Sequence, residues 1–507
     1  MQHVICIDAG TQSLRAGVVD SSGCVKYMSS FDYSPEFMTG NRAEQKPESF
    51  ERALFDTLSG VGLFLLQHID ISVECIAVTS QRASVIPVNK SGKPLYNALM
   101  WQDKRAIIEC GKIAELISPE NLYQQCGLRL DPYFSLPKML WFKNNEPEIW
   151  KQTHKLIGVQ DYLCFLLTGK YVTDRSQACR TMLLDIRNFQ WNSELLNLVG
   201  IEREKLCDLC DAGGVAGEFS SPFAKRVSIP AGIPVLLCGG DQQCAALALG
   251  LFEKGTATAN TGTGSFVLGY ADRPTFDAQQ RVLCSAAAIP GQWIVEAGIY
   301  ASGATYNWCR RELFDPQHGD QQTTFETVNE QVKKVPAGSN GVLVMPHFSG
   351  SAAPNWNPLA KGIVFNLGLG STRAEICRAT LEGIAGEIAD NIELIASIAG
   401  KIKCVYVAGG LTRSSEYCQI MSDNLGRVVV RRKNPEAAFM GCLMSACVTL
   451  GIYKDYREAF DNIAIEESEQ FHPDPERGKV YGKARMLKRA LYKSLDENGI
   501  YKMAYGS

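Results

Sequence analysis

The sequence predicts an α/β protein built from two related domains. Three observations lead to this prediction: short apolar segments that end in glycine-rich turns, long amphipathic segments with helical periodicity, and a strand–turn–strand pattern that recurs about 250 residues further along. This interval is far longer than a solenoid repeat, so the recurrence favours two facing copies of one domain. We place the boundary near residue 248 and expect domains at residues 1–248 and 249–507.

The first half contains three predicted strands, each of which ends in a polar turn, and one buried helix. The strands are Val4–Ile7 before the turn DAGTQSLR, Cys75–Thr79 before SQR, and Ile233–Cys238 before GGDQQ. The segment after the last turn, Cys244–Phe252, is apolar on all sides, which is typical of a buried helix.

In the second half the hairpin pattern returns. A strand at 255–260 precedes the turn Thr261–Ser265, and the apolar residues 266–268 begin the next strand. A long helix is predicted near Ala374–Ala399, followed by a strand at Cys404–Ala408 that ends in GGLT. Spaced apolar residues after Pro473 predict a closing helix.

Composition limits the classes of partner. The chain has 507 residues, of which 46% are hydrophobic and 21% charged, so it can form a large core. Its 51 Lys and Arg residues nearly balance 54 Asp and Glu residues, and no basic block predicts a nucleic-acid surface. No uncharged apolar run reaches the ~18 residues of a membrane span. We therefore expect a small-molecule partner, with no nucleic acid and no membrane.

The eighteen cysteines are scattered along the chain. Asp8 interrupts the N-terminal apolar stretch, so no secretory signal peptide is predicted, and a reducing cytoplasm fits better than a disulfide framework. The one CxxC motif, Cys207 to Cys210, lacks the second pair of Cys or His ligands that a zinc site needs. We expect free, mostly buried thiols in a cytoplasmic protein.

The glycine-rich turns point to phosphate binding. Glycine permits close approach of the backbone, and its neighbouring Thr and Ser residues add hydroxyl groups to the backbone N–H donors. Two such turns, Asp8–Arg15 and Thr261–Ser265, together with Gly409–Gly410, are suited to hold a polyphosphate from both sides. The alternative that each is an ordinary hairpin turn stays open. Neither a P-loop nor a dinucleotide-binding glycine motif is present.

Two carboxylates follow predicted strands. Asp8 lies beside the first phosphate turn, where Mg²⁺ would need one or two carboxylates in addition to phosphate oxygens and water. Asp241 can instead accept a proton from an attacking hydroxyl group, because phosphoryl transfer needs positioning and a base. The alternative is that both residues only cap turns.

Several ordered motifs carry a family resemblance. The segment Tyr133–Asn145 agrees with the first signature of the FGGY carbohydrate kinases, and further similar segments lie at 80–82, 97–103, 240–243, 353–358 and 473–475. The chain thus resembles the FGGY family along nearly its whole length, and within it the glycerol kinases most.

This resemblance implies an α/β fold of two actin-like ATPase (ribonuclease H-like) domains, with ATP and Mg²⁺ in the cleft between them. The N-terminal domain would bind the sugar or polyol and the C-terminal domain the nucleotide. Asp241 would be the catalytic base and Asp8 the metal ligand. The positions that match nucleotide and phosphate contacts are Thr11, Gln12, Arg15, Gly262, Thr263, Gly303, Asn307, Gly410 and Leu411.

The acceptor pocket matches less completely. The positions that match the family's polyol contacts are Arg82, Trp101, Tyr133, Asp241, Gln242 and Phe266. Glycerol kinases have a glutamate directly after the arginine, whereas this chain has Ala83. Loss of a hydroxyl acceptor changes discrimination by as much as ~10⁴ where that contact is decisive. The resemblance therefore implies an ATP-dependent kinase of a small sugar or polyol, with a longer polyol or a ketose favoured over glycerol.

Other interpretations stay open at this point. Glycerol itself, or a ketose such as xylulose or ribulose, is an alternative acceptor. An actin-like ATP-binding switch without kinase activity is an alternative of another class, although it would not need a sugar pocket. Without the resemblance, Trp101 and Tyr133 are equally typical of a core, and Arg82 of an ion pair. The oligomeric state also stays open, with a homodimer as one alternative.

Overall fold

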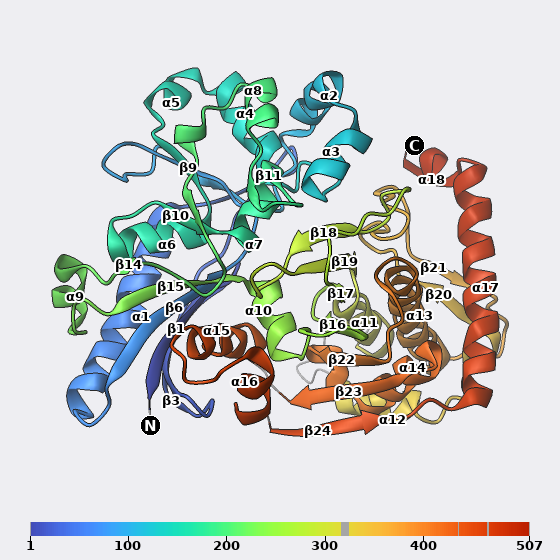
Figure 1. Ribbon diagram of the computed structural model, residues 1–507. Coiled ribbons are helices and arrows are strands. Elements are labelled where there is room, and N and C mark those ends of the chain that lie inside the picture. The colour runs from blue at the N-terminus through green and yellow to red at the C-terminus, as the bar shows by residue number, and fades with distance from the viewer. Residues whose placement is uncertain (1, 316–323, 434–435, 464–465, 506–507) are drawn as a thin grey trace.

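Two mixed β-sheets organise the computed structural model, which describes residues 2–315, 324–433, 436–463 and 466–505 (Figure 1). The first sheet has the order β14-β15-β6-β1-β2-β3, and the second β18-β19-β17-β16-β22-β23-β24. The strands of the first are β1 (His3–Ala9), β2 (Ser13–Asp20), β3 (Val25–Asp32), β6 (Val73–Ser80), β14 (Gly214–Glu218) and β15 (Pro234–Gly240). Those of the second are β16 (Thr256–Thr261), β17 (Ser265–Ala271), β18 (Leu283–Ala286), β19 (Trp293–Ile299), β22 (Cys404–Ala408), β23 (Val428–Lys433) and β24 (Glu466–Phe471).

The two sheets repeat one pattern of pairing. Along β3-β2-β1-β6-β15-β14 the five pairings are antiparallel, antiparallel, parallel, parallel and antiparallel. The same succession runs along β19-β17-β16-β22-β23-β24. The hairpin that recurs in the sequence therefore belongs to a six-strand arrangement that occurs in both sheets. This confirms the expectation of two related domains. The residue at which one ends and the other begins remains a prediction.

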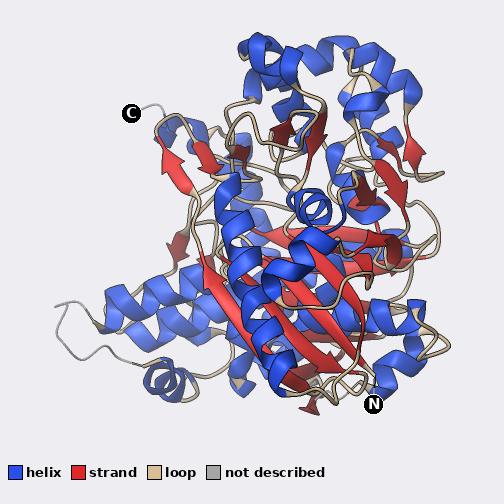
Figure 2. Cartoon of the chain, turned by 90° about the vertical axis from the view of Figure 1, so that its left-hand side faces the viewer, coloured by secondary structure: helices blue, strands red, loops and turns tan. Residues whose placement is uncertain are grey.

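Both faces of the first sheet are buried at its centre, as β1 shows. Ile5 and Ile7 point toward one apolar cluster, which includes side chains of α1 (Pro47–Gln67) and α6 (Val159–Thr168). Their neighbours Val4 and Cys6 point to the other face, where α10 (Asp241–Ala248) and α15 (Ala437–Thr449) pack. Because alternate residues of a strand face opposite sides, a continuous apolar run fits a strand covered on both faces. Figure 2 shows strands between layers of helix.

A largely helical insertion lies between β6 and β14. Its helices are α2 (Ile107–Leu116), α3 (Pro119–Cys126), α4 (Ser135–Asn145), α5 (Pro147–Gln152), α6, α7 (Arg175–Ala178) and α8 (Ser193–Val199), and α9 (Ser221–Val227) follows β14. Short strands form small separate sheets: β4 (Glu36–Met38), β5 (Arg42–Gln45) and β8 (Ala98–Leu99) in one, then β7 (Ile86–Val88) with β9 (Lys155–Ile157), β10 (Val172–Asp174) with β13 (Asp208–Cys210), and β11 (Leu184–Asp185) with β12 (Gln190–Trp191).

The second sheet carries its own helices. The longest, α13 (Arg373–Ala399), begins with a capping box between Thr372 and Glu375, in which each side chain bonds the other's backbone N–H. It packs so closely on β17 that a Cβ atom at Gly269 would lie 2.3 Å from Ile395. The other elements here are α11 (Gly303–Cys309), α12 (Phe325–Val332), α14 (Ser415–Leu425), α16 (Tyr456–Asn462), α17 (Pro475–Glu497), α18 (Ile500–Tyr505), β20 (Leu343–Met345) and β21 (Ile363–Phe365).

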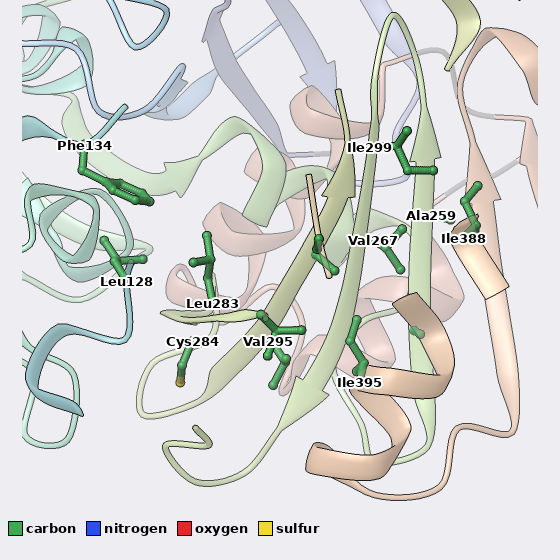
Figure 3. Close-up of a cluster of buried hydrophobic side chains, with 14 of the residues drawn as sticks. Leu128, Phe134, Ala259, Val267, Leu283, Cys284, Val295, Ile299, Ile388 and Ile395 are labelled. Atoms are coloured by element: carbon green, nitrogen blue, oxygen red, sulfur yellow. The ribbon is translucent and has the colours of Figure 1, made fainter. Parts of the chain in front are cut away.

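One apolar core joins the helical insertion to the second sheet. Figure 3 shows Leu128 and Phe134 of the insertion beside Leu283 and Val295 of β18 and β19. A hydrogen bond also joins the two parts, because the Tyr123 hydroxyl of the insertion donates to the Val282 carbonyl at 2.9 Å, directly before β18. The insertion therefore ties the two sheets together close to the predicted acceptor residues.

The structure corrects some element boundaries. The buried helix predicted over Cys244–Phe252 is α10, which begins at Asp241 and ends at Ala248 because Gly250 takes a left-handed conformation with φ +98°. The strand before it, β15, continues through Gly240. The closing helix exists as α17, but only Tyr481 among its predicted apolar residues is buried. All eighteen cysteines are free thiols, and all but three are buried.

Candidate active site

The predicted functional turns meet at one edge of the first sheet. The neighbouring strands β1, β6 and β15 are parallel, so their carboxyl ends lie side by side (Figure 1). Asp8 lies near the end of β1, Arg82 just beyond β6, and Asp241 directly after β15. Two strand spacings, about 10 Å in total, separate β1 from β15. The sheet therefore places the two predicted catalytic carboxylates on either side of a common space.

The first phosphate turn is held by its neighbours. The Gly10 N–H donates to the Ser13 carbonyl at 2.9 Å and closes the turn. The Gly10 carbonyl in turn accepts bonds from the Tyr33 hydroxyl at 3.0 Å and the Gln81 amide at 3.3 Å. Thr11 is half-buried and Gln12 exposed at the tip. Both predicted phosphate contacts thus remain reachable on a turn with a fixed backbone.

Asp8 is buried and incompletely bonded. Its residue is 3% exposed, and its Oδ2 accepts a bond from Arg15 Nη2 at 2.8 Å. Among the described residues, no group donates to its other oxygen, Oδ1. Burial raises the pKa of Asp8, and the charge of Arg15 counteracts part of this rise. A buried carboxylate oxygen without a donor fits a divalent cation, which supplies the missing positive charge.

Glu436 is a site residue that the sequence did not reveal. It immediately precedes α15, and its carboxylate accepts a bond from Arg15 Nη1. Arg15, expected to face phosphate, is therefore bridged between Asp8 and Glu436. The two residues are 421 positions apart, so no local pattern could have paired them.

The second phosphate turn is built by close backbone approach. A Cβ atom at Gly303 would lie 2.4 Å from the Gly262 carbonyl, and one at Gly409 would lie 2.4 Å from the Thr261 carbonyl. The Gly303 N–H donates to the Gly262 carbonyl at 3.1 Å, and Leu411 lies beside Gly303. Only glycine permits these contacts. Gly262, Thr263, Gly303 and Leu411 are thereby gathered at one place.

The remaining predicted nucleotide contacts flank this turn. Asn307 lies one helical turn beyond Gly303 in α11 and is exposed, with its Oδ1 accepting a bond from Arg310 at 3.1 Å. Gly410 is exposed at the start of a short 3₁₀ turn that follows β22. The exposed residues around the second turn therefore come from three separate segments of the chain.

Asp241 and Arg82 form a pair at the predicted acceptor site. Arg82 Nε lies 3.7 Å from Asp241 Oδ1, and the Asp241 side chain is 23% exposed whereas that of Arg82 is 2% exposed. Gly240 lets the two meet, because a Cβ atom there would lie 2.5 Å from Arg82 Cδ. Burial raises the pKa of Asp241 to about 6, although Arg82 acts in the opposite direction. Asp241 is thus a carboxylate that titrates close to neutral pH, as a general base requires.

Two aromatic side chains form a wall beside the first turn. The Trp101 indole N–H donates to Thr11 Oγ1 at 3.1 Å, and the Trp101 and Tyr133 rings lie 5.4 Å apart. Tyr133 is held by buried Lys138, which donates to its carbonyl at 2.6 Å and to the carbonyls on either side. Predicted acceptor and phosphate residues are therefore in direct contact at Thr11 and Trp101.

The last two predicted acceptor residues are placed by their elements. Gln242 directly follows Asp241 and donates its backbone N–H to Asp241 Oδ1 at 2.7 Å. Phe266 lies on β17, paired with Gly298 of β19, and is half-buried. Among the predicted acceptor residues, it is therefore the one that lies on the second sheet.

Ala83 has an unusual backbone conformation beside Arg82. Its φ of +66° lies in the left-handed region that non-glycine residues seldom adopt, and the residue is 5% exposed. Its carbonyl accepts a bond from the Ser135 hydroxyl at 3.3 Å. The methyl side chain cannot accept a hydrogen bond, so only the backbone of this residue can make polar contacts.

A buried carboxylate of the second sheet also reaches this site. Glu296 of β19 lies 3.2 Å from Arg82 and 2.8 Å from Arg180. The Arg180 guanidinium lies 5.8 Å from the centre of the Tyr133 ring. Neither Glu296 nor Arg180 stands in a motif that the sequence analysis singled out. Only the approach of β19 to the first domain reveals them.

Comparison with known proteins decides the family. Residues 3–248 match the N-terminal domain of the FGGY family of carbohydrate kinases, and residues 257–450 match its C-terminal domain. The chain belongs to the FGGY family of carbohydrate kinases. This membership confirms the resemblance seen in the sequence, makes the protein a carbohydrate kinase, and disfavours the alternative of an ATP-binding switch.

Relatives of this FGGY kinase include both glycerol kinases and a xylulose kinase. It is 31% identical to the glycerol kinase of Pasteurella multocida and 26% identical to the xylulose kinase of Lactococcus lactis, over 98% of each chain in both cases. The crystal structure of Plasmodium falciparum glycerol kinase with ADP has the same fold, with a TM-score of 0.87 and 23% identity over 98% of each chain. Family membership implies ATP as phosphate donor and a sugar or polyol as acceptor.

The described part of this FGGY kinase has neither a candidate membrane span nor a clustered metal site. None of its helices there combines the length and the apolar character needed to cross a membrane. The same residues contain no cluster of three or more His, Cys, Asp or Glu side chains arranged for a metal ion. Mg²⁺ does not need such a cluster, since it commonly keeps several waters and binds one or two carboxylates together with substrate phosphates.

Proposed function

We propose that this enzyme transfers the γ-phosphate of ATP to a hydroxyl group of a small sugar or polyol larger than glycerol. The observation that supports this most strongly is Asp241. It is partly exposed, it titrates near pH 6, and it is paired with Arg82 at the sheet edge where Asp8 also lies. A carboxylate of this kind can accept the proton of an attacking hydroxyl group at neutral pH.

The residues divide into acceptor and donor groups. Arg82 and Gln242 offer N–H donors to acceptor hydroxyl groups, and Trp101, Tyr133 and Phe266 cover its C–H bonds. The N-terminal domain, residues 1–248, would carry all of these except Phe266. The donor group is formed by the two glycine turns with Thr11, Gln12 and Thr263, and by Gly303, Asn307, Gly410 and Leu411 beside the nucleotide.

Asp8 is the residue that would hold Mg²⁺. Its burial supports this role, as does its Oδ1, which accepts no hydrogen bond from the part of the chain that the structure describes. Bound Mg²⁺ would supply positive charge to the phosphate oxygens. Arg15 keeps Asp8 in place and favours its ionised form, against the effect of burial, by pairing with its Oδ2. The bridge from Arg15 to Glu436 joins this carboxylate to the segment that begins α15, so both halves of the chain define the donor site.

Ala83 supports an acceptor larger than glycerol. A glutamate at this position would accept a bond from a hydroxyl group, and its loss removes that contact and leaves space beside Arg82. A three-carbon polyol would lose one of few contacts, whereas a longer chain can fill the space and reach other groups. Discrimination of ~10²-fold or more between the two sizes is expected from a lost hydroxyl contact.

A substrate panel tests this proposal. We expect purified enzyme with ATP and Mg²⁺ to phosphorylate one or more of erythritol, ribitol, xylulose, ribulose and gluconate with a higher kcat/KM than glycerol. ADP release measured by a coupled assay, with product mass confirmed, gives the ranking. The variant Ala83→Glu should shift the ratio toward glycerol. A preference of the unmodified enzyme for glycerol over every larger compound would contradict the size argument, and no turnover with any compound would contradict the kinase assignment.

The rate should depend on pH through Asp241. A base must be ionised, and burial raises the pKa of Asp241 to about 6. We therefore expect kcat/KM for the acceptor to fall roughly tenfold per pH unit below pH 6 and to level off above pH 7. Initial rates between pH 5 and 8, at saturating ATP, measure this. A fall in kcat/KM that begins only near pH 4, the ordinary pKa range of Asp, would show that a carboxyl group with a raised pKa is not the group that titrates.

A further inference from the structure

Glu296 is the carboxylate that joins the two domains at the acceptor site. Its side chain is 5% exposed and accepts from Arg82 Nη1 at 3.2 Å and from Arg180 Nη1 at 2.8 Å. Arg180 also donates to the Ser285 hydroxyl at 2.9 Å. The two arginines belong to the first half of the chain, whereas Glu296 and Ser285 lie on β19 and β18 of the second sheet.

Arg82 is held at both ends of its guanidinium group. Its Nε faces Asp241 at 3.7 Å, and its Nη1 is bonded to Glu296. Its methylene groups pack against Gly240, where a Cβ atom would lie 2.7 Å from Arg82 Cγ. Contact with Gly240 thus fixes the position of the Arg82 methylene groups, and the bond to Glu296 fixes the position of the guanidinium group.

The strand register places Glu296 toward the acceptor site. In the antiparallel pair β17–β19, Phe266 is opposite Gly298 and Leu268 is opposite Glu296. Opposite residues share a face, as do residues two apart in one strand. Glu296 and Phe266 therefore lie on the same face of the second sheet. This face of the second sheet thus provides Phe266, which is assigned to the acceptor, and also Glu296, which reaches the acceptor site through its bond to Arg82.

The charges around Glu296 keep it ionised. Burial opposes its charge, but Arg180 and Arg82 outweigh burial and hold the pKa of Glu296 below its usual range. Around Arg82 itself lie Glu296, Tyr133, Asp241 and Cys179, and the carboxylates help to raise its pKa despite burial. Asp241 also faces Asp8. Arg82 is thus a fully charged group shared by two carboxylates, one from each domain.

We propose that Glu296 is a positioning residue for the acceptor: it holds the Arg82 guanidinium in the orientation that meets acceptor hydroxyl groups beside Asp241. The inference rests on the proposed function, because Arg82 is assigned there to the acceptor. It adds that acceptor binding depends on the second domain, which carries Glu296. A polyol can be bound correctly only while β19 lies against the first domain, so acceptor binding and the approach of the two domains favour each other.

The variant Glu296→Gln tests the proposal. Glutamine keeps the shape but removes the charge, and its NH₂ group faces a guanidinium that can only donate. We expect kcat/KM for the acceptor to fall on the order of 10- to 100-fold, mainly through a higher acceptor KM, because Arg82 loses its fixed orientation. The KM for ATP should change by less than about threefold, because Glu296 acts on the acceptor side of the site. General damage to the fold would instead raise the KM values of both substrates.

Glu382→Gln is the matched control. Glu382 of α13 is also a buried carboxylate of the second domain, with a side chain 8% exposed and 2.9 Å from Arg378. It should lower the Tm, as Glu296→Gln should, because a buried arginine loses one of its carboxylate partners; Arg378 keeps Glu416 at 2.7 Å, as Arg82 keeps Asp241 at 3.7 Å. It should leave both KM values unchanged. Equal effects of the two variants on acceptor KM would overturn a specific role for Glu296.

A double-mutant cycle with Arg82→Met identifies the route. If Glu296 acts through Arg82, adding Glu296→Gln to Arg82→Met should change acceptor kcat/KM far less than it does in the unmodified enzyme. A full additional loss in the double variant would overturn the proposal.

The variant Glu296→Asp serves if circular dichroism shows Glu296→Gln to be unfolded. It keeps the charge on a shorter side chain and should still raise the acceptor KM alone; an unchanged acceptor KM overturns the proposal. An unmodified enzyme inactive on every acceptor overturns the proposed function and this inference together.

Discussion

Replacing Asp241 with asparagine should lower kcat by ~10³-fold, the size expected when a general base is removed. Asparagine has nearly the same shape but cannot accept the proton of the acceptor hydroxyl. The backbone bond from Gln242 to Oδ1 can be kept by the amide oxygen. The fold and the nucleotide turns should therefore be undisturbed. Steady-state kinetics with the best acceptor measure the loss, and calorimetric titration with ATP should show nearly unchanged binding.

Asp272→Asn is a suitable control for this substitution. Asp272 directly follows β17 and makes an exposed ion pair with Lys254, with its side chain 46% exposed. Exposed ion pairs contribute little to stability because water screens both charges, so this variant should behave like the unmodified enzyme. Turnover of Asp241→Asn within tenfold of the unmodified rate would refute the assignment of the base.

Replacing Asp8 with asparagine should lower kcat by ~10²-fold or more, the size typical of removing one preorganised electrostatic group from a transition state. The loss should come with a higher Mg²⁺ concentration for half-maximal rate, because an amide oxygen is a weaker ligand than a carboxylate. Arg15 would also lose one of its two carboxylate partners and keep Glu436. Rates measured over a series of Mg²⁺ concentrations at fixed ATP provide the readout.

Asp20→Asn controls for damage to the same hairpin. Asp20 ends β2, is 1% exposed, and accepts bonds from Ser22 and Cys24 at the opposite end of the strand. Its loss should reduce stability without changing the Mg²⁺ dependence. If Asp8→Asn and Asp20→Asn show the same Mg²⁺ dependence as the unmodified enzyme, Asp8 is not the metal ligand.

Local patterns carried much of the fold prediction. A continuous apolar run such as Val4–Ile7 must be covered on both faces, and a glycine-rich turn with hydroxyl groups is a short-range feature, so both were visible before any tertiary information. The hairpin recurrence indicated two related domains, and the five matching strand pairings confirm them. Element ends were less predictable. Gly250 ends α10 earlier than hydrophobicity suggests, because its left-handed φ cannot be inferred from an apolar run.

The candidate site was predicted residue by residue where a motif was present. Asp8 lies near the end of a strand, and Arg82 and Asp241 follow strands. Parallel neighbours bring strand ends together, so the proximity of the three residues is expected once the sheet order is known. Glu436 and Glu296 belong to no such pattern. Each contributes a carboxylate to an arginine more than 200 positions away. Their role follows only from the packing of α15 and β19 against the first domain.

The sequence by itself determined the α/β class, the duplicated hairpin, the glycine-rich turns and the family resemblance, because periodicity, turn chemistry and ordered motifs are local properties of the chain. Only the tertiary structure decided which charges share the site: Arg15 with Glu436, and Arg82 with Glu296. Such ion pairs depend on the distance and burial between remote segments, and neither quantity is encoded in local spacing. The sequence alone left Arg82 as either a substrate contact or an ion-pair residue, and the structure shows it paired with both Asp241 and Glu296.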